Sequence, residues 1–248
     1  MEIRVLGAHN VESATTRLTS LLIDDVLAVD TGALTSSLSL QEQEKVSSIH
    51  RSLYAYYYIR DVATIALNIS HFQKTIRVYS QPSTLDVISD NILNGIICPK
   101  FTETPPENPA LKFCPLEPYN VEDVGGYKVL AVPVKHTVPT VGYQITSGEG
   151  KSFFYSGDTG PGLSACWEYL SPQLLIIDVA LADRLEEHAS SSGHLTPRLL
   201  AEELAEFKKI DGYLPPVVLI HLSPLFEGEI KEEVGQVAKE LGASITLT

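Results

Sequence analysis

The stretch that decides the fold is "FFYSGDTG", residues 153–160, where an apolar β-type run ends in Asp158 within a glycine-flanked turn. Taken alone, this aspartate predicts only a turn, because its carboxylate can cap nearby backbone N–H groups. Three other apolar runs also end in a polar side chain: "VPVKHT" (132–137) in His136, "VVLIHLSP" (217–224) in His221 and "VLAVDTG" (26–32) in Asp30. In α/β folds, functional side chains gather at strand ends and in the loops beyond them. The four endings therefore predict one functional site.

The residue types at these endings indicate metal chemistry. A single histidine at a strand end is more often a hydrogen-bonded structural residue than a ligand. His136, Asp158 and His221 together offer imidazole and carboxylate groups, which suit zinc or iron, on rigid elements that hold a ligand geometry.

Composition limits the function classes. The 248 residues carry a formal net charge of −13, which argues against non-specific binding to nucleic acid or to an acidic membrane surface. A small anionic substrate held by a metal remains compatible with that charge. Cys98, Cys114 and Cys166 form no C-x-x-C pair, which argues against a zinc–cysteine site or a disulfide framework. Without a signal-like N-terminus or an apolar run of about 20 residues, we expect a soluble, cytoplasmic protein.

The pattern of elements predicts one mixed α/β domain spanning 1–248. A helix is predicted at 59–70, with its apolar side chains on one face, and residues 98–125 are predicted to form a long loop. A helix over 195–210 takes Thr196 as its N-cap, and a last helix is closed by Gly242. The predicted strands are 1–7, 19–24, 26–30, 75–80, 127–134, 141–146, 152–156, 172–178, 215–221 and 244–248, and the other predicted helices are 82–93, 160–170 and 231–243.

Several of these motifs resemble one family. "VDTG", "SGDTG" and "IHLSP" match patterns of the metallo-β-lactamase superfamily, and residues 182–204, "ADRLEEHASSSGHLTPRLLAEEL", resemble a segment of its phosphodiesterase branch. That branch includes class II cyclic-nucleotide phosphodiesterases and tRNA 3′-processing nucleases. The resemblance covers nearly the whole chain. It implies an αββα sandwich, with two mixed sheets flanked by helices and a dinuclear metal site at one edge of the sheets.

The resemblance also implies residue roles. His136 would bind one metal and His221 the other, with Asp158 bridging them and a bridging water attacking phosphorus. His194, in "SGHLT", would lie near the phosphate and donate a hydrogen bond or a proton; the alternative is a structural residue at the entry to the next helix. Asp30 would not bind the metal itself but would orient one of its ligands. The implied cofactor is zinc, or else manganese or iron, as one ion or none. The implied substrate is a small phosphodiester or cyclic-nucleotide-like molecule, and a homodimer is left open.

One segment departs from the family pattern. The family places an H-x-H-x-D-H run before a helix, where this chain reads "SLYAYYYIRD", residues 52–61. Leu53 and Ala55 stand at the first two histidine positions, Tyr57 at the aspartate and Tyr58 at the last histidine. Leucine and alanine cannot bind metal, and a tyrosine hydroxyl with a pKa near 10 needs a strong cation to become a ligand. A normal dinuclear site is therefore not expected, although one ion, rescued by Tyr58 or His50, is left open.

Two functions compete. The first is a metal-dependent, phosphodiesterase-like hydrolase, impaired because the first metal-binding motif is absent. The second is a catalytically inactive family member that binds a ligand or a partner, with tyrosines filling the site and hydrogen-bonding its remaining groups. A third alternative is a mononuclear site of His136, Asp158 and His221. Residues 53–58 can also be interpreted as a strand.

Overall fold

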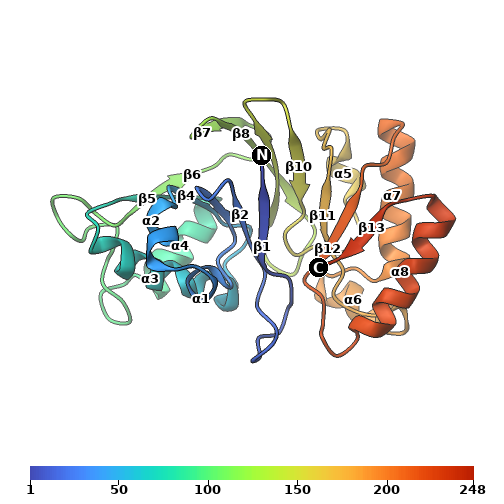
Figure 1. Ribbon diagram of the computed structural model, residues 1–248, viewed down its shortest axis with the longest axis horizontal. Coiled ribbons are helices and arrows are strands. Elements are labelled where there is room, and N and C mark those ends of the chain that lie inside the picture. The colour runs from blue at the N-terminus through green and yellow to red at the C-terminus, as the bar shows by residue number, and fades with distance from the viewer. The chain divides into compact units, whose positions relative to one another are not determined.

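The computed structural model describes residues 1–248, apart from the side chain of Tyr56. The chain divides into two compact units (Figure 1). Unit 1 comprises residues 1–7 and 17–117, and unit 2 comprises residues 8–16 and 118–248. Each unit contains one mixed sheet with helices packed against it. The predicted class, two mixed sheets flanked by helices, is confirmed; the single domain over 1–248 stays a prediction.

Unit 1 contains a six-stranded sheet in the order β1-β2-β3-β4-β5-β6. The first three strands pair antiparallel, and β3 to β6 pair parallel. The strands are β1 (Ile3–Gly7), β2 (Ser20–Ile23), β3 (Leu27–Val29), β4 (Ser48–His50), β5 (Ile76–Ser80) and β6 (Leu111–Pro115). The helices are α1 (Leu34–Ser37), α2 (Leu40–Lys45), α3 (Tyr56–Ser70) and α4 (Pro82–Asn91).

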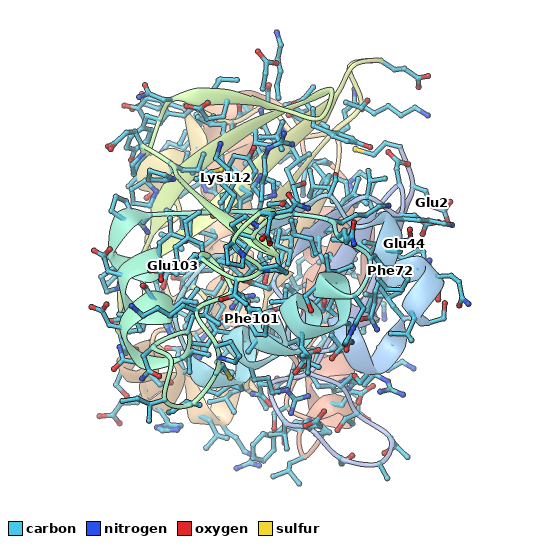
Figure 2. The ribbon with its side chains drawn as sticks, turned by 90° about the vertical axis from the view of Figure 1, so that its left-hand side faces the viewer. Glu2, Glu44, Phe72, Phe101, Glu103 and Lys112 are labelled. Carbon is cyan, nitrogen blue, oxygen red and sulfur yellow. The ribbon has the colours of Figure 1, made fainter. Side chains whose placement is uncertain are left out.

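Helix α3 forms because apolar residues recur every three or four positions and bury one face. Its predicted core positions are all buried: Ile59, Val62, Ile65, Ala66 and Ile69. Phe101 packs into the same apolar cluster, and Phe72 lies against it (Figure 2). The helix begins at Tyr56, three residues before the predicted start, so the strand interpretation of 53–58 is wrong.

Unit 2 contains a seven-stranded sheet in the order β13-β12-β11-β10-β9-β8-β7. Strands β7 to β10 pair antiparallel, and β10 to β13 pair parallel. The strands are β7 (Val121–Val124), β8 (Tyr127–Val134), β9 (Thr140–Ser147), β10 (Ser152–Tyr155), β11 (Leu175–Asp178), β12 (Val217–Ile220) and β13 (Ile245–Leu247). The helices are α5 (Ser164–Trp167), the 3₁₀ turn η1 (Asp183–Leu185), α6 (Glu186–Ser192), α7 (Pro197–Asp211) and α8 (Glu227–Leu241).

Strand direction positions the candidate site. Because β8 and β10 are both antiparallel to β9, they run in the same direction, and β11 and β12 run parallel to β10. These four strands therefore end at the same edge of the sheet, which is where α/β folds place ligands. His136, Asp158, Asp178 and His221 lie at or just after these ends.

The helix ends in unit 2 follow the sequence closely. The Thr196 side chain accepts a hydrogen bond from Leu199 N at the start of α7, as predicted for an N-cap. Gly242 closes α8 with φ 61°, a left-handed conformation that glycine adopts at low cost.

The loop predicted for 98–125 is wrong, because it contains β6 and β7. Their strand signal is short and lies among prolines and acidic residues. Helices α1, α2 and α6 had no prediction, and they are only four to seven residues long. Among the described residues, no helix is long and apolar enough to span a bilayer.

Candidate active site

Five titratable side chains of unit 2 form the candidate site, which we call the His–Asp cluster: His136, Asp158, Asp178, His194 and His221. Two groups of three within it could hold a metal ion, and within each group the ligand atoms lie within 4.8 Å of one another. The first group is His136, Asp158 and His194, and the second is Asp178, His194 and His221. His194 is common to both groups.

His136 is oriented by the turn that closes α6. Its Nδ1 lies 2.8 Å from the carbonyl oxygen of Gly193. A carbonyl only accepts, so Nδ1 carries the proton and Nε2 is left with a lone pair. Gly193 has φ 79°, and a Cβ at this position would lie 2.6 Å from His136 Nδ1. Glycine is therefore required here both for backbone conformation and for space.

His194 follows the same turn and pairs with the last residue of β11. Its Nδ1 lies 2.7 Å from Asp178 Oδ2, and Thr159 N donates to the same oxygen at 3.0 Å. Asp178 is fully buried, and its Oδ1 has no hydrogen-bond partner among the described residues. Burial lowers the pKa of His194, but the carboxylates of Asp178 and Asp158 outweigh it and raise the pKa to about 9.

Asp158 and His221 form a buried pair in which His221 Nδ1 lies 3.4 Å from Asp158 Oδ1. Burial lowers the pKa of His221 to about 3, so the imidazole is neutral at ordinary pH. His221 has φ 61°, a left-handed conformation that is costly for a side chain of this size. Strain of this kind gathers at functional sites, where the surrounding structure maintains it.

The three imidazoles form a row with His194 in the middle. The ring centroids of His136 and His194 are 5.0 Å apart, and those of His194 and His221 are 4.9 Å apart with the rings stacked. The structure thus brings His136, Asp158 and His221 to one sheet edge, while His194 is the residue that links them. Their roles as ligands stay predictions.

Sequence reasoning missed Asp178. Its signal was present, because the buried strand "PQLLIID" (172–178) ends in an aspartate, as the runs before Asp158 and His221 end in polar residues. It was overlooked because no glycine or proline turn follows directly.

The replaced motif lies in unit 1, at the start of α3. Leu53 and Tyr58 are fully buried, Ala55 precedes the first helical residue, and Tyr57 is 41% exposed. These four positions provide no imidazole or carboxylate.

Asp30 supports the segment that leads into this motif. Its carboxylate accepts hydrogen bonds from Ser52 N at 3.0 Å and Ser52 Oγ at 2.6 Å. It also pairs with Arg51 Nη1 at 3.0 Å, and both side chains are fully buried. Ser52 directly precedes Leu53, the first replaced ligand position. The role of Asp30 in orienting a ligand stays a prediction.

Comparison with a family model identifies the class of protein. The model described as "Beta-lactamase superfamily domain" matches residues 59–222, more than half of the chain. The chain therefore belongs to the β-lactamase superfamily. A search among curated proteins finds no match.

Solved structures with the same fold include three proteins that align with this chain over 95% or more of both chains. Unliganded yeast PDE1 is 17% identical, with 99% of this chain and 96% of that chain covered and a TM-score of 0.80. The metallo-β-lactamase fold protein YhfI from Bacillus subtilis is 16% identical, with 99% and 95% covered and a TM-score of 0.78. Human tRNase Z, short form, is 19% identical, with 100% and 96% covered and a TM-score of 0.68. The chain has the metallo-β-lactamase fold.

This fold implies a bound divalent metal, and the donors of unit 2 fit one ion. In unit 2, imidazole and carboxylate groups converge within the distance that one ion can bridge after small side-chain rotations. In unit 1, Leu53 and Ala55 carry no donor atom, and Tyr57 and Tyr58 offer only phenol groups.

Proposed function

We propose that the chain binds phosphoesters at the His–Asp cluster and hydrolyses them slowly, as an impaired metal-dependent, phosphodiesterase-like hydrolase. The observation that carries the proposal is the Asp178–His194 pair, held next to His136 and Asp158. The names of two proteins with the same fold, PDE1 and tRNase Z, support the phosphoester class.

Asp178 keeps a proton on His194 Nδ1 by accepting it in a hydrogen bond at 2.7 Å. This fixes the ring, so that only Nε2 can contact a ligand near His136 and Asp158. Protonated at Nε2, His194 would donate a hydrogen bond to a phosphate oxygen or a proton to the leaving oxygen. His136 and Asp158 would hold a divalent ion. Such an ion supplies Lewis acidity to a phosphoryl group and acidity to water.

The impairment follows from the sequence of the first motif. Dinuclear phosphoesterases use two metals to stabilise both the attacking and the leaving oxygen. With no imidazole or carboxylate at positions 53, 55, 57 and 58, the chain lacks the donors that the family motif supplies for a second ion. A member that binds its ligand without any turnover is the second candidate, and complete burial of Leu53 and Tyr58 favours it.

Hydrolysis of bis(p-nitrophenyl) phosphate with added Zn²⁺ or Mn²⁺ tests the proposal, together with calorimetric binding of a non-hydrolysable phosphodiester. We expect the non-hydrolysable phosphodiester to bind. We expect the turnover number to lie well below that of typical enzymes, which is about 1–10³ s⁻¹. His194→Ala should abolish binding, whereas His188→Ala, at an exposed position of α6, should not. Turnover within the typical range would disprove impairment, and absence of both binding and turnover would disprove the phosphoester class.

A further inference from the structure

We infer that the chain binds one divalent ion, held entirely by unit 2, and that His194 is one of its ligands through Nε2, alongside His136 and Asp158. His194 would thus serve as a ligand in place of the donors missing from unit 1. The inference rests on the proposed function and deepens it. It adds a second reason why hydrolysis would be slow.

Proximity is the first support. The ligand atoms of His136, Asp158 and His194 lie within 4.8 Å of one another. Zinc binds imidazole nitrogen at about 2.0–2.1 Å and carboxylate oxygen at about 2.0–2.2 Å, so the ligand atoms of a tetrahedral site are roughly 3.3 Å apart. Side-chain rotations that draw the three ligand atoms together by about 1.5 Å would complete a three-ligand site. Three protein ligands and an open position are typical of catalytic zinc sites.

The outer nitrogens provide the second support. Metal-binding histidines almost always donate their other N–H to a carbonyl or a carboxylate, which fixes the tautomer and strengthens the ligand. His136 Nδ1 donates to Gly193 O at 2.8 Å, and His194 Nδ1 lies 2.7 Å from Asp178 Oδ2. Both imidazoles therefore direct Nε2 away from their supporting partner, and an ion at His194 would displace the proton that this Nε2 carries at neutral pH.

The second group of the cluster is less suitable for an ion. There, Asp178 and His194 would both be ligands, yet they already bind each other, and Thr159 N donates to the same carboxylate oxygen. An ion that took Asp178 Oδ2 or His194 Nδ1 would have to break these bonds, which leaves only Asp178 Oδ1 and His194 Nε2 of these two residues for an ion in this group. An ion on the first group leaves them intact.

This assignment has a chemical cost. An Nε2 that binds a metal has no proton to donate, so the residue that would protonate the leaving oxygen is occupied. A single ion thus disables the acid as it binds, which gives a physical reason for slow hydrolysis.

Metal binding to the chelator-treated full chain tests the inference without measuring activity. We expect calorimetry and elemental analysis with Zn²⁺ to give about one ion per chain. Loss of a residue that hydrogen-bonds to a metal ligand lowers metal affinity by about 10–100-fold. His194→Ala should lower the affinity for Zn²⁺ by more than this, because it removes a ligand itself. His188→Ala should bind like the unmodified protein, and His221→Gln should still bind about one ion. In ¹⁵N-histidine spectra, Zn²⁺ should shift Nε2 of His194.

Three results would overturn the inference: two ions per chain, no ion, or full affinity in His194→Ala. Circular dichroism of each variant separates misfolding from loss of a ligand. If His194→Ala retains the ion but loses phosphodiester binding, the inference fails and the proposed function stands. If metal binding follows the expectation but no phosphodiester binds, the proposed function fails instead.

Discussion

His194 Nδ1 and Asp178 Oδ2 lie 2.7 Å apart, joining the residue before α7 to the last residue of β11. The pair is held on both sides, because Thr159 N donates to the same oxygen and Asp178 is fully buried. It determines which nitrogen of the central histidine faces the rest of the His–Asp cluster.

Replacing Asp178 by Asn should lower the pKa of His194 from about 9, because a negative charge that raises it is removed. A histidine pKa raised on folding stabilises the protein fully below its unfolded value of about 6.5, and this contribution is lost as pH rises through about 9. We therefore expect the unfolding free energy of the native chain to fall over this range, and that of Asp178→Asn to fall less. Urea unfolding at pH 6 and pH 9.5 measures both, with Glu187→Gln, at an exposed position, as the control. Equal pH dependence in all three proteins would contradict the assignment of the pair.

Gly193→Ala should lower the affinity for Zn²⁺, and the loss should exceed what its effect on stability explains. The new Cβ would lie 2.6 Å from His136 Nδ1 and would displace the imidazole. Gly212 is a matched control, because it also ends a helix with φ 76° but has no atom within 4 Å of the added Cβ. The left-handed backbone alone should cost roughly 1–2 kcal/mol of stability in each variant. Gly193→Ala should cost more, because its Cβ also lies 3.0 Å from His136 Cα and Thr137 N. Only Gly193→Ala should lower Zn²⁺ affinity in calorimetry, and an equal loss in Gly212→Ala would show that the contact with His136 is unimportant.

Asp30→Asn should destabilise the protein by about 3–5 kcal/mol, because it removes the carboxylate charge that pairs with the fully buried Arg51 guanidinium. Asparagine tolerates the left-handed backbone of Asp30, φ 53°, so the charge is the main change. Asp25→Asn is the control: Asp25 has φ 61° and pairs with Arg4 near the surface, where such pairs contribute about 1 kcal/mol or less. Chemical denaturation compares the two, and a similar small loss in both would mean that the buried pair is not needed.

Restoring the family motif should create a second metal position. The variant combines Leu53→His, Ala55→His, Tyr57→Asp and Tyr58→His, and we expect about two Zn²⁺ ions per chain instead of about one. Loss of stability is expected, because Leu53 and Tyr58 are fully buried and replacing a large buried apolar side chain costs about 2–5 kcal/mol. A restored protein that folds but still binds no more than one ion would show that the motif register is wrong.

The sequence alone predicted the parts of the fold with strong periodicity or clear punctuation. Helix α3 was recognised from its apolar face and α7 from the Thr196 cap, since both signals are local. Strand β6 was missed because it is short, lies among prolines and pairs with β5, which is distant in the sequence. Strand β7 was missed because it has only four residues, two of them acidic, although it pairs with the next strand, β8, across Gly125 and Gly126.

The sequence predicted which residues form the candidate site better than it predicted how they are arranged. Strand endings located His136, Asp158 and His221, because residue type and strand termination can both be read from the chain. The position of His194 between the other imidazoles, and its pairing with Asp178, depend on how α6 turns into α7 against β11. That arrangement arises from tertiary packing, which no local pattern contains.

All five members of the His–Asp cluster belong to one sheet and its connections, and the replaced motif belongs to the other. Gene changes confined to codons 53–58 could therefore erase half of an ancestral catalytic set without altering a single side chain of the remaining half. Such a chain keeps the "SGDTG" and "IHLSP" signatures without the first motif. Surveys that assign activity from the "SGDTG" and "IHLSP" signatures alone would count it as an active enzyme, so both halves of the motif set should be inspected before activity is inferred.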